Sequence, residues 1–387
     1  MVSLLVVACA VSQAAGPLCA PGHGAAPQGI DAQRPYVLSA AYPFWRAATF
    51  PPEAIPFEFV HQIDHCFVMP GEHGTLQVPN GFVMPELLEM AHRADRKVIL
   101  GVGGANSHDA FATMAADPHD RGTFVRHLTD FVLDQGYDGV TIDWEFPQTP
   151  ADRQNLTALM AELRAGLDAT DGDLALSIAV SSNEQRGQWV DVETITPLVH
   201  HYVVMTFGYH GAWGSESGHN APLYPPPLQE SQVTPHHLGR GCVDQSLRYW
   251  TQTRGVPRSK IVMGLPSFGI WFDSEGLYQP FTSSRKADYR DIKPLIEQSQ
   301  DGNGYTYHWD ATAQVPYLTQ DTGPGLWSYD DPQSVGVKCD YVLANELGGI
   351  AVWDVTMDLV AGEHELLKVI AHKLMPYRIY LPSLRKG

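Results

Sequence analysis

Positive charge is scarce in this sequence. The 387 residues include 25 lysine and arginine residues against 43 aspartate and glutamate residues, a formal net charge of -18 at pH 7. Nucleic acid binding needs a positive surface, because phosphate contacts supply most of its affinity. The composition therefore argues against a nucleic acid partner and favours a neutral polymer. The 9 tryptophans and 16 tyrosines suit such a partner, although core packing also explains them.

Cysteine is also sparse and shows no metal-binding spacing. The five cysteines are Cys9, Cys19, Cys66, Cys242 and Cys339, and none stands in a Cys-x-x-Cys pair or at zinc-site spacing from histidine. We therefore expect no structural metal and no cofactor. The spacing leaves any disulfide pairing open. Cys66 lies in an apolar strand pattern, which predicts a buried thiol.

No apolar stretch after the N-terminal leader has the length of a membrane span. The leader, residues 1–15, holds an apolar run from Leu4 to Ala10 and small residues ending at Ala14 and Ala15, as in a secretory signal. It lacks the lysine or arginine that normally precedes such a run. We expect a secreted or exported protein without a membrane span, and a monomer.

Two enzyme motifs are incomplete. The glycines at 101, 103 and 104 lack the third, spaced glycine and the following acidic residue of a dinucleotide-binding turn. Ser182 does not lie in a nucleophile elbow. Neither a nicotinamide enzyme nor a serine hydrolase is indicated.

Short apolar runs alternate with amphipathic stretches, which is the pattern of βα units around a parallel sheet. Eight such runs predict a (β/α)₈ TIM barrel that forms one catalytic domain over residues 34–373. The candidate strands are 36–42, 63–69, 97–103, 139–145, 174–181, 202–207, 261–266 and 349–353, and helical patterns cover 86–96, 122–135 and 152–167. The long segment 272–326 predicts a small α+β insertion between strands seven and eight, rich in strand-forming aromatic residues, that could wall a cleft.

The stretch from Asp138 to Pro147 has the sequence Asp-Gly-Val-Thr-Ile-Asp-Trp-Glu-Phe-Pro. Side chains alternate along a strand, so Thr141, Asp143 and Glu145 share one face. In a barrel this face is the interior, and barrel enzymes keep their active sites where the strands end. Two neighbouring carboxylates can hold one proton near neutral pH, which is what a general acid needs.

This motif resembles the signature strand of glycoside hydrolase family 18, the chitinases and their relatives, which is Asp-x-x-Asp-x-Asp-x-Glu. Other segments are similar to further strands and loops of the family, in the same order and at matching spacing. They are 97–104, 205–213, 218–224, 256–266 and 348–353.

The resemblance implies that Glu145 protonates the glycosidic oxygen while the substrate's own N-acetyl carbonyl attacks the anomeric carbon. Asp143 would orient the acetamido group, and Trp353 would form the floor of the subsite for the distorted sugar. The remaining candidate sugar contacts are Tyr42, Phe67, Met205, Tyr209, His210 and Thr141. The implied activity is retaining hydrolysis of β-1,4-linked N-acetylglucosamine glycans, chitin or chitooligosaccharides.

Several positions depart from the family pattern. Thr141 stands where the family has its second aspartate, and Gly101 where its third strand has serine. Phe207 and Gly208 replace a Tyr-Asp pair, which removes a hydroxyl and a carboxylate that would hold the N-acetylated sugar. Tyr209 or a residue of the insertion could replace them.

The sequence also bears on other functions. A silent or weak lectin-like protein of the same fold would typically lose the glutamate, whereas Glu145 and Asp143 are both present. An endo-β-N-acetylglucosaminidase or a peptidoglycan-directed hydrolase of the same fold stays open. An unrelated aldolase would need a Schiff-base lysine at an inward strand position, and the candidate strands offer none.

Overall fold

The computed structural model describes residues 36–170, 172–225 and 241–375. The leader of residues 1–15, with Cys9 and Cys19, lies outside the described residues. Cys66 is buried, as its strand pattern predicted. Among the described helices, none is long and apolar enough to cross a membrane.

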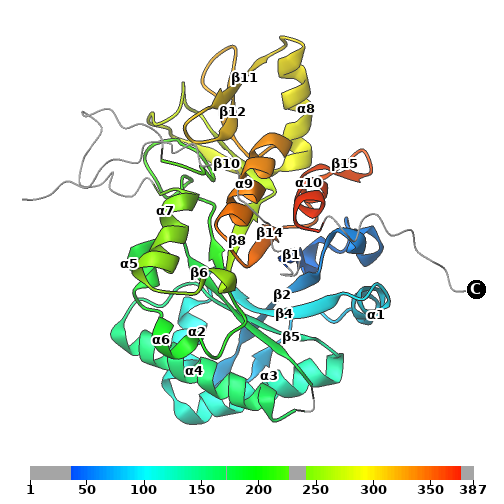
Figure 1. Ribbon diagram of the computed structural model, residues 1–387, viewed down its shortest axis with the longest axis vertical. Helices are drawn as coiled ribbons and strands as arrows, with labels where there is room; N and C mark the ends of the chain where they lie inside the picture. Colours follow the sequence, from blue (N-terminus) through cyan, green and yellow to red (C-terminus); the bar gives the residue numbers. More distant parts are fainter. Residues whose placement is uncertain (1–35, 171, 226–240, 376–387) are drawn as a thin grey trace, which may run out of the picture. The chain divides into compact units, whose positions relative to one another are not determined.

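Eight parallel strands form a closed barrel, which confirms the predicted TIM-barrel fold (Figure 1). Neighbouring strands follow the order β1-β14-β8-β7-β6-β5-β4-β2, and pairing of β1 with β2 closes the ring. The strands are β1 (Val37–Pro43), β2 (Gln62–Pro70), β4 (Lys97–Gly104), β5 (Gly139–Trp144), β6 (Ala175–Ser181), β7 (His201–Met205), β8 (Ile261–Pro266) and β14 (Gly349–Trp353). A short strand, β3 (Leu76–Gln77), pairs antiparallel with β2.

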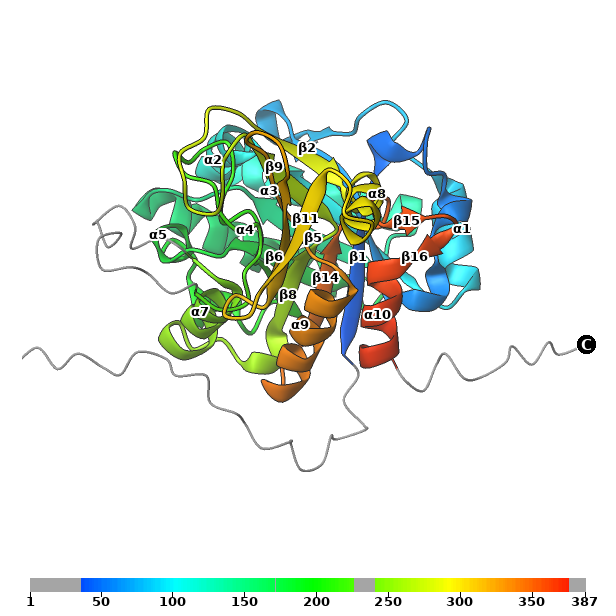
Figure 2. The ribbon, with the colours of Figure 1, turned by 90° about the horizontal axis from the view of Figure 1, so that it is seen from above.

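Helices follow most of the barrel strands. They are α1 (Pro85–Arg93), α2 (His108–Ala116), α3 (Pro118–Gln135), α4 (Pro150–Asp168), α5 (Glu184–Gly187), α6 (Val192–Ile195), α7 (Val243–Arg248), α9 (Pro332–Ala344) and α10 (Glu365–Leu374). The helix α4 begins at a capping box, in which Thr149 accepts from the backbone N–H of Asp152 and the Asp152 carboxylate accepts in return. Figure 2 shows α9 and α10 side by side.

The chain between β8 and β14 builds a separate antiparallel sheet, the lobe, seen at the top of Figure 1. Its strands are β9 (Phe268–Phe272), β10 (Ser284–Asp288), β11 (Tyr305–Asp310), β12 (Val315–Gln320) and β13 (Leu326–Ser328), in the order β10-β9-β13-β12-β11. One helix, α8 (Tyr289–Gln300), follows β10, so the insertion between the seventh and eighth barrel strands has α+β structure, as predicted. A small hairpin, β15 (Leu359–Val360) with β16 (Glu363–His364), precedes α10.

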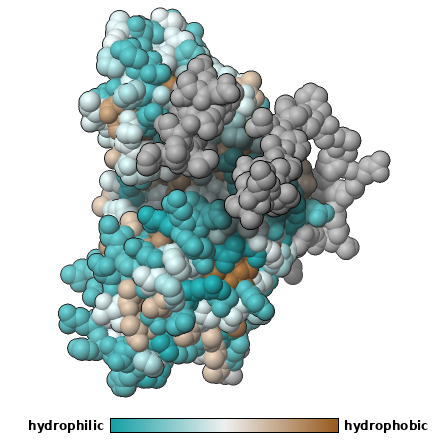
Figure 3. Space-filling view, turned by 90° about the vertical axis from the view of Figure 1, so that its left-hand side faces the viewer, coloured by the Kyte–Doolittle hydropathy of each residue, from teal (hydrophilic) through white to brown (hydrophobic). Residues whose placement is uncertain are grey.

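Apolar side chains fill the space between the barrel and its helices. Outside β5, Trp144 stacks on Phe111 of α2 with ring centroids 5.2 Å apart and an angle of 10°. On the face shown in Figure 3, hydrophilic residues predominate and hydrophobic residues occur in small patches. The stacking of Trp144 on Phe111 thus fixes the outer side of β5, and the inner side of this strand faces the barrel interior.

Strand β4 approaches β5 closely where β5 carries its carboxylates. Gly103 pairs with Asp143 and has a φ of 113°, in the region that glycine adopts without strain. A Cβ on Gly103 would lie 2.2 Å from the backbone oxygen of Asp143 and 2.8 Å from the Phe111 ring. Only glycine therefore fits at this point of the barrel wall.

A Gly103→Ala substitution should lower the free energy of unfolding by about 1–3 kcal/mol, because the added methyl group meets backbone and the φ is strained. Gly122→Ala is the matched control. Gly122 lies in α3 and a Cβ there meets nothing within 4 Å, so alanine should raise the free energy by about 0.5–1 kcal/mol. Urea unfolding of both variants measures the two effects, and equal signs would contradict the proposed close approach.

Candidate active site

A cavity of about 740 Å³ opens at the carboxyl ends of the barrel strands. Residues at the ends of all eight strands line it, and the lobe adds Phe268 and Lys286. Barrel enzymes place their catalytic groups at this end, because the loops that follow the strands converge there. The cavity is therefore the candidate active site.

Three side chains of the β5 segment line this cavity, namely Thr141, Asp143 and Glu145. Trp144, between the two carboxylates, points to the opposite side, where it meets α2. Asp143 is 7% exposed, whereas Glu145 is only partly buried. Strand alternation thus brings the two carboxylates of the sequence motif to one wall.

Ser107, in the loop after β4, holds the backbone between these carboxylates. Its hydroxyl donates to the backbone oxygen of Asp143 at 3.0 Å and accepts from the backbone N–H of Glu145 at 2.9 Å. Ser107 is fully buried. The backbone that carries Glu145 is therefore fixed by an interaction that the sequence motif gave no sign of.

Burial raises the proton affinity of both carboxylates, and at Asp143 the charge of Glu145 adds to it. Burial, followed by the charge of Glu145, raises the pKa of Asp143 well above its ordinary value. Burial also raises the pKa of Glu145, while the nearby cations Arg186 and Lys286 act to lower it. One oxygen of Asp143 is buried without a hydrogen-bond partner among the described residues. The pair can hold a proton near neutral pH, as a general acid must.

Aromatic side chains form a row along the cavity. Phe67 of β2 stacks on Trp353 at the end of β14, with centroids 5.7 Å apart and an angle of 17°. The ring of Trp45 lies 6.5 Å from that of Phe67, centre to centre, and Trp45 is 53% exposed. Met205 also lines the cavity. These flat apolar faces are suited to stacking against sugar rings.

The glycine at position 101 makes room for this row. A Cβ on Gly101 would lie 3.0 Å from the Phe67 ring, and one on Gly104 would lie 2.6 Å from it. The β2–β4 register shifts between His65 and Val68, which is where Phe67 enters the cavity. Gly101, which stands where the family has serine, thus leaves space that the Phe67 ring occupies.

Phe207 and Gly208 leave the next part of the wall without a hydroxyl or carboxylate. The Phe207 ring lies against Phe268 of the lobe, 5.8 Å away at 83°. The backbone N–H of Gly208 donates to Asn220 at 3.0 Å. Lys286 of β10 stands over the same Phe268 ring at 4.9 Å. An apolar pair and a cation therefore occupy this side of the cavity.

Three candidate sugar contacts do not line the cavity. Tyr42 is fully buried and its hydroxyl donates to the backbone oxygen of Phe50 at 2.8 Å. Its neighbour Ala41 lines the cavity instead, because adjacent residues of a strand face opposite sides. The Tyr209 hydroxyl pairs with Ser246 of α7 at 2.7 Å, so this tyrosine does not replace the missing hydroxyl.

His210 also lies away from the cavity. Its Nδ1 is 3.1 Å from the backbone oxygen of His219, and its ring meets Tyr278 edge-on at 5.7 Å. We therefore correct the expectation for Tyr42, Tyr209 and His210: the structure places them in the surrounding packing.

Sequence reasoning missed three charged residues of the cavity, Arg186, Lys286 and Asp64. Arg186 comes from α5, directly after a barrel strand, which is where a search of strand ends could have found it. Asp64 interrupts an apolar strand, another usable signal. Lys286 lies far along the chain in the lobe, and no spacing pointed to it.

Asp64 lies deep in the cavity and accepts hydrogen bonds from Ser39 and, at 3.1 Å, from Gln62. Burial raises its pKa to about 6, against the effect of these two donors. No group of three or more histidine, cysteine, aspartate or glutamate residues in the described chain could hold a metal ion.

The family model for glycosyl hydrolases family 18 matches residues 48–358. A probable endochitinase of Caenorhabditis elegans is 33% identical over 281 residues, which is 68% of this chain and 44% of that protein. Chitinase A1 of Niallia circulans is 32% identical over 292 residues, 68% of this chain and 40% of that protein. The chain thus spans less than half the length of these two relatives.

Solved structures of similar fold include a Group IV chitinase of Ostrinia furnacalis in complex with allosamidin. It has a TM-score of 0.79 and 25% identity, and the match covers 88% of this chain and 99% of the other. A family 18 N-acetylglucosaminidase from Paenibacillus barengoltzii has a TM-score of 0.74 and 25% identity, over 87% and 99% of the two chains.

The raised pKa of Asp64 predicts a specific pH dependence of stability. The folded protein binds this proton more tightly than the unfolded chain, so the free energy of unfolding should fall as the pH rises from about 4 through about 6. Asp64→Asn removes this titration. Urea unfolding at several pH values should show the variant gaining about 2–3 kcal/mol on the wild type between about pH 4 and pH 7. A difference that does not change with pH would contradict the assignment.

Proposed function

Since this chain belongs to family 18 of the glycosyl hydrolases, we propose that it is a retaining glycosidase with Glu145 as its general acid. The proposed substrates are β-1,4-linked N-acetylglucosamine glycans, namely chitin or chitooligosaccharides. The observation that carries the proposal is the pair of carboxylates, Asp143 and Glu145, on one wall of an aromatic-lined cavity. For localisation we propose export, on the basis of the leader alone.

The proposed reaction needs no protein nucleophile. The acetamido oxygen of the bound sugar attacks its own anomeric carbon while the bond to the leaving oxygen breaks. That oxygen takes the proton of Glu145 and departs as an alcohol, leaving an oxazolinium ion. Glu145, now a carboxylate, accepts a proton from the water that attacks the same carbon and reopens the ring. The acid is thus restored.

The proposed role of Asp143 follows from its burial. A carboxyl with a strongly raised pKa can retain its proton beside Glu145 and still offer an oxygen to the acetamido N–H. Its unpartnered oxygen leaves a hydrogen-bonding position open on the wall. Because Phe207 and Gly208 supply no polar side chain, Asp143 would carry most of the orientation of the acetamido group.

The proposed position of the sugar rests on Trp353. This side chain ends β14, lines the cavity and is backed by the Phe67 ring. A ring stacked on Trp353 would lie across the barrel axis, near the carboxylates of β5. Thr141 and Met205 line the same space.

Glu145→Gln should lower kcat on N-acetylglucosamine oligomers by about 10²–10⁴, because the amide keeps the shape of the side chain but cannot deliver a proton. Binding of the oligomer, followed by calorimetry, should stay close to that of the wild type. Glu86→Gln, at an exposed position of α1, is the control and should leave kcat unchanged. Wild-type turnover by Glu145→Gln would remove Glu145 from the acid role.

The product should keep the β configuration, because ring closure and water attack each invert the anomeric carbon. Proton NMR of fresh product, recorded before mutarotation, distinguishes the two anomers. An initial α-anomer would contradict substrate assistance, whatever the glycan.

A comparison of substrates distinguishes the proposed function from the alternatives. Oligomers of N-acetylglucosamine, peptidoglycan fragments and a high-mannose glycoprotein are incubated with the protein, and products are identified by mass. Cleavage of one class names the substrate. Binding without any product would identify a carbohydrate-binding protein of the same fold.

A further inference from the structure

Two cations line the cavity beside Glu145, whose ionised form they favour. Arg186 belongs to α5 and Lys286 to β10 of the lobe, and both side chains are exposed. Within the described residues, neither takes part in an ion pair closer than 4 Å, although the chain has 43 acidic residues against 25 basic ones. In so acidic a protein, two such cations beside the catalytic pair need an explanation.

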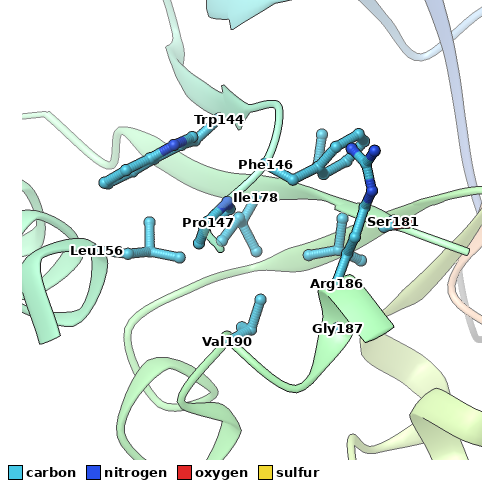
Figure 4. A pocket seen from close by; sticks show the side chains of 11 residues that line it. Trp144, Phe146, Pro147, Leu156, Ile178, Ser181, Arg186, Gly187 and Val190 are labelled. Atoms are coloured by element: carbon cyan, nitrogen blue, oxygen red, sulfur yellow. The ribbon is translucent and has the colours of Figure 1, made fainter. Parts of the chain in front are cut away.

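Aromatic faces hold these cations in position. The Arg186 guanidinium carbon lies 4.4 Å from the centre of the Phe146 ring, and Figure 4 shows the two side chains against each other. Lys286 stands 4.9 Å from the centre of the Phe268 ring. A cation over a ring is located by the ring but keeps its N–H donors for another acceptor.

Arg186 lies where the main cavity meets a second one of about 400 Å³. Glu145 and Phe146 also line both cavities. A sugar stacked on Trp353 would lie in the main cavity, and a bond reached by Glu145 would then lead the leaving group toward the second cavity. No tryptophan lines this second cavity; its other side chains include His108, Asp109 and Gln148. Its occupant would therefore be held by polar and charged contacts.

Lys286 faces the cavity from the lobe, on the side of Phe207 and Phe268. The preceding residue, Arg285, points to the other face of β10 and packs over Trp271, 5.0 Å from the ring centre. Because side chains alternate along a strand, Lys286 faces the cavity while Arg285 packs on the opposite face of β10.

We propose that the glycan cleaved here carries carboxylates on the sugars next to the N-acetylglucosamine, with Arg186 binding the one on the leaving-group side and Lys286 one on the other side. This inference rests on the proposed function: it keeps Glu145 as the acid and N-acetylglucosamine as the sugar that is cleaved, and it places acidic sugars where chitin has further N-acetylglucosamines. In a polymer that alternates N-acetylglucosamine with an acidic sugar, carboxylates flank each N-acetylglucosamine on both sides. The acid can be a uronic acid or a lactyl ether, as in N-acetylmuramic acid.

The net charge of the chain does not oppose this substrate at the cavity. Exposed charges act over about 8–10 Å at physiological salt, so a bound sugar meets the charges of the cavity itself, Arg186 and Lys286 among them, and not the net charge of the chain. A guanidinium also matches the planar geometry of a carboxylate.

The test compares tetrasaccharides of equal length. They are chitotetraose, an alternating oligomer of N-acetylglucosamine and uronic acid, an alternating oligomer of N-acetylglucosamine and N-acetylmuramic acid, and the methyl esters of the two acidic oligomers. We expect kcat/KM for at least one acidic oligomer to exceed that of its own ester about tenfold, which is about 1.4 kcal/mol. The oligomer that shows this ratio identifies the source of the carboxylate. Acids cleaved no faster than their esters would overturn the proposal.

Variants assign the effect to the two cations. Arg186→Gln and Lys286→Gln should each reduce the ratio of kcat/KM for the acidic oligomer to kcat/KM for its ester. Because each variant cleaves both substrates, any effect of the substitution on Glu145 itself cancels in this ratio. Arg186→Lys keeps the charge and should retain part of the ratio. Arg285→Gln is the matched control on β10 and should leave it unchanged. An unaltered ratio in both glutamine variants would also refute the proposal.

The measurements distinguish a hydrolase without a carboxylate preference from a protein that cleaves none of the oligomers. Chitotetraose cleaved as fast as the acidic oligomers would leave the hydrolase intact and refute the carboxylate preference. If no oligomer is cleaved, the proposed function fails, and the preference is then judged by calorimetry on the wild type. We then expect an acidic oligomer to bind about tenfold more tightly than its ester, and equal affinities would refute the carboxylate preference.

Discussion

Asp143 and Glu145 share one wall of the cavity, and the repulsion between their charges governs the chemistry that the site can perform. Burial makes ionisation of Asp143 unfavourable, and the charge of Glu145 adds to this effect. The barrel forces the proximity, because strand alternation gives both side chains the same face and Ser107 fixes the backbone between them. A proton is therefore retained at the mouth of the barrel, where a glycosidic oxygen could take it.

The exchanges at Gly101, Phe207 and Gly208 make the surrounding wall more apolar. Gly101 leaves space for the Phe67 ring, which supports Trp353. Phe207 packs against Phe268 of the lobe instead of offering a hydroxyl. The wall near the carboxylates is thus lined by apolar rings, whereas Arg186 and Lys286 add charges that favour the ionised form of Glu145.

The lobe makes the two sides of the cavity chemically different. It adds Phe268 and Lys286 to the side that holds Phe207, whereas the smaller cavity beyond Glu145 has a polar lining and shares Arg186. A glycan that crosses Glu145 would therefore pass from stacking contacts to charged ones. In this fold the loops and the insertion bring their own residues to the rim, while the barrel supplies the carboxylate pair.

The sequence alone determined the barrel, its eight strands and the carboxylate pair, because apolar runs and side-chain alternation are local properties of the chain. It also indicated Trp353, Phe67 and Met205, which end up in the cavity. Only the tertiary structure decided the rest. Tyr42 turns outward by the pleat of β1, and Tyr209 finds Ser246 on α7. Ser107, Arg186 and Lys286 reach Glu145 from other elements, and such contacts depend on how those elements pack, which no spacing along the chain records.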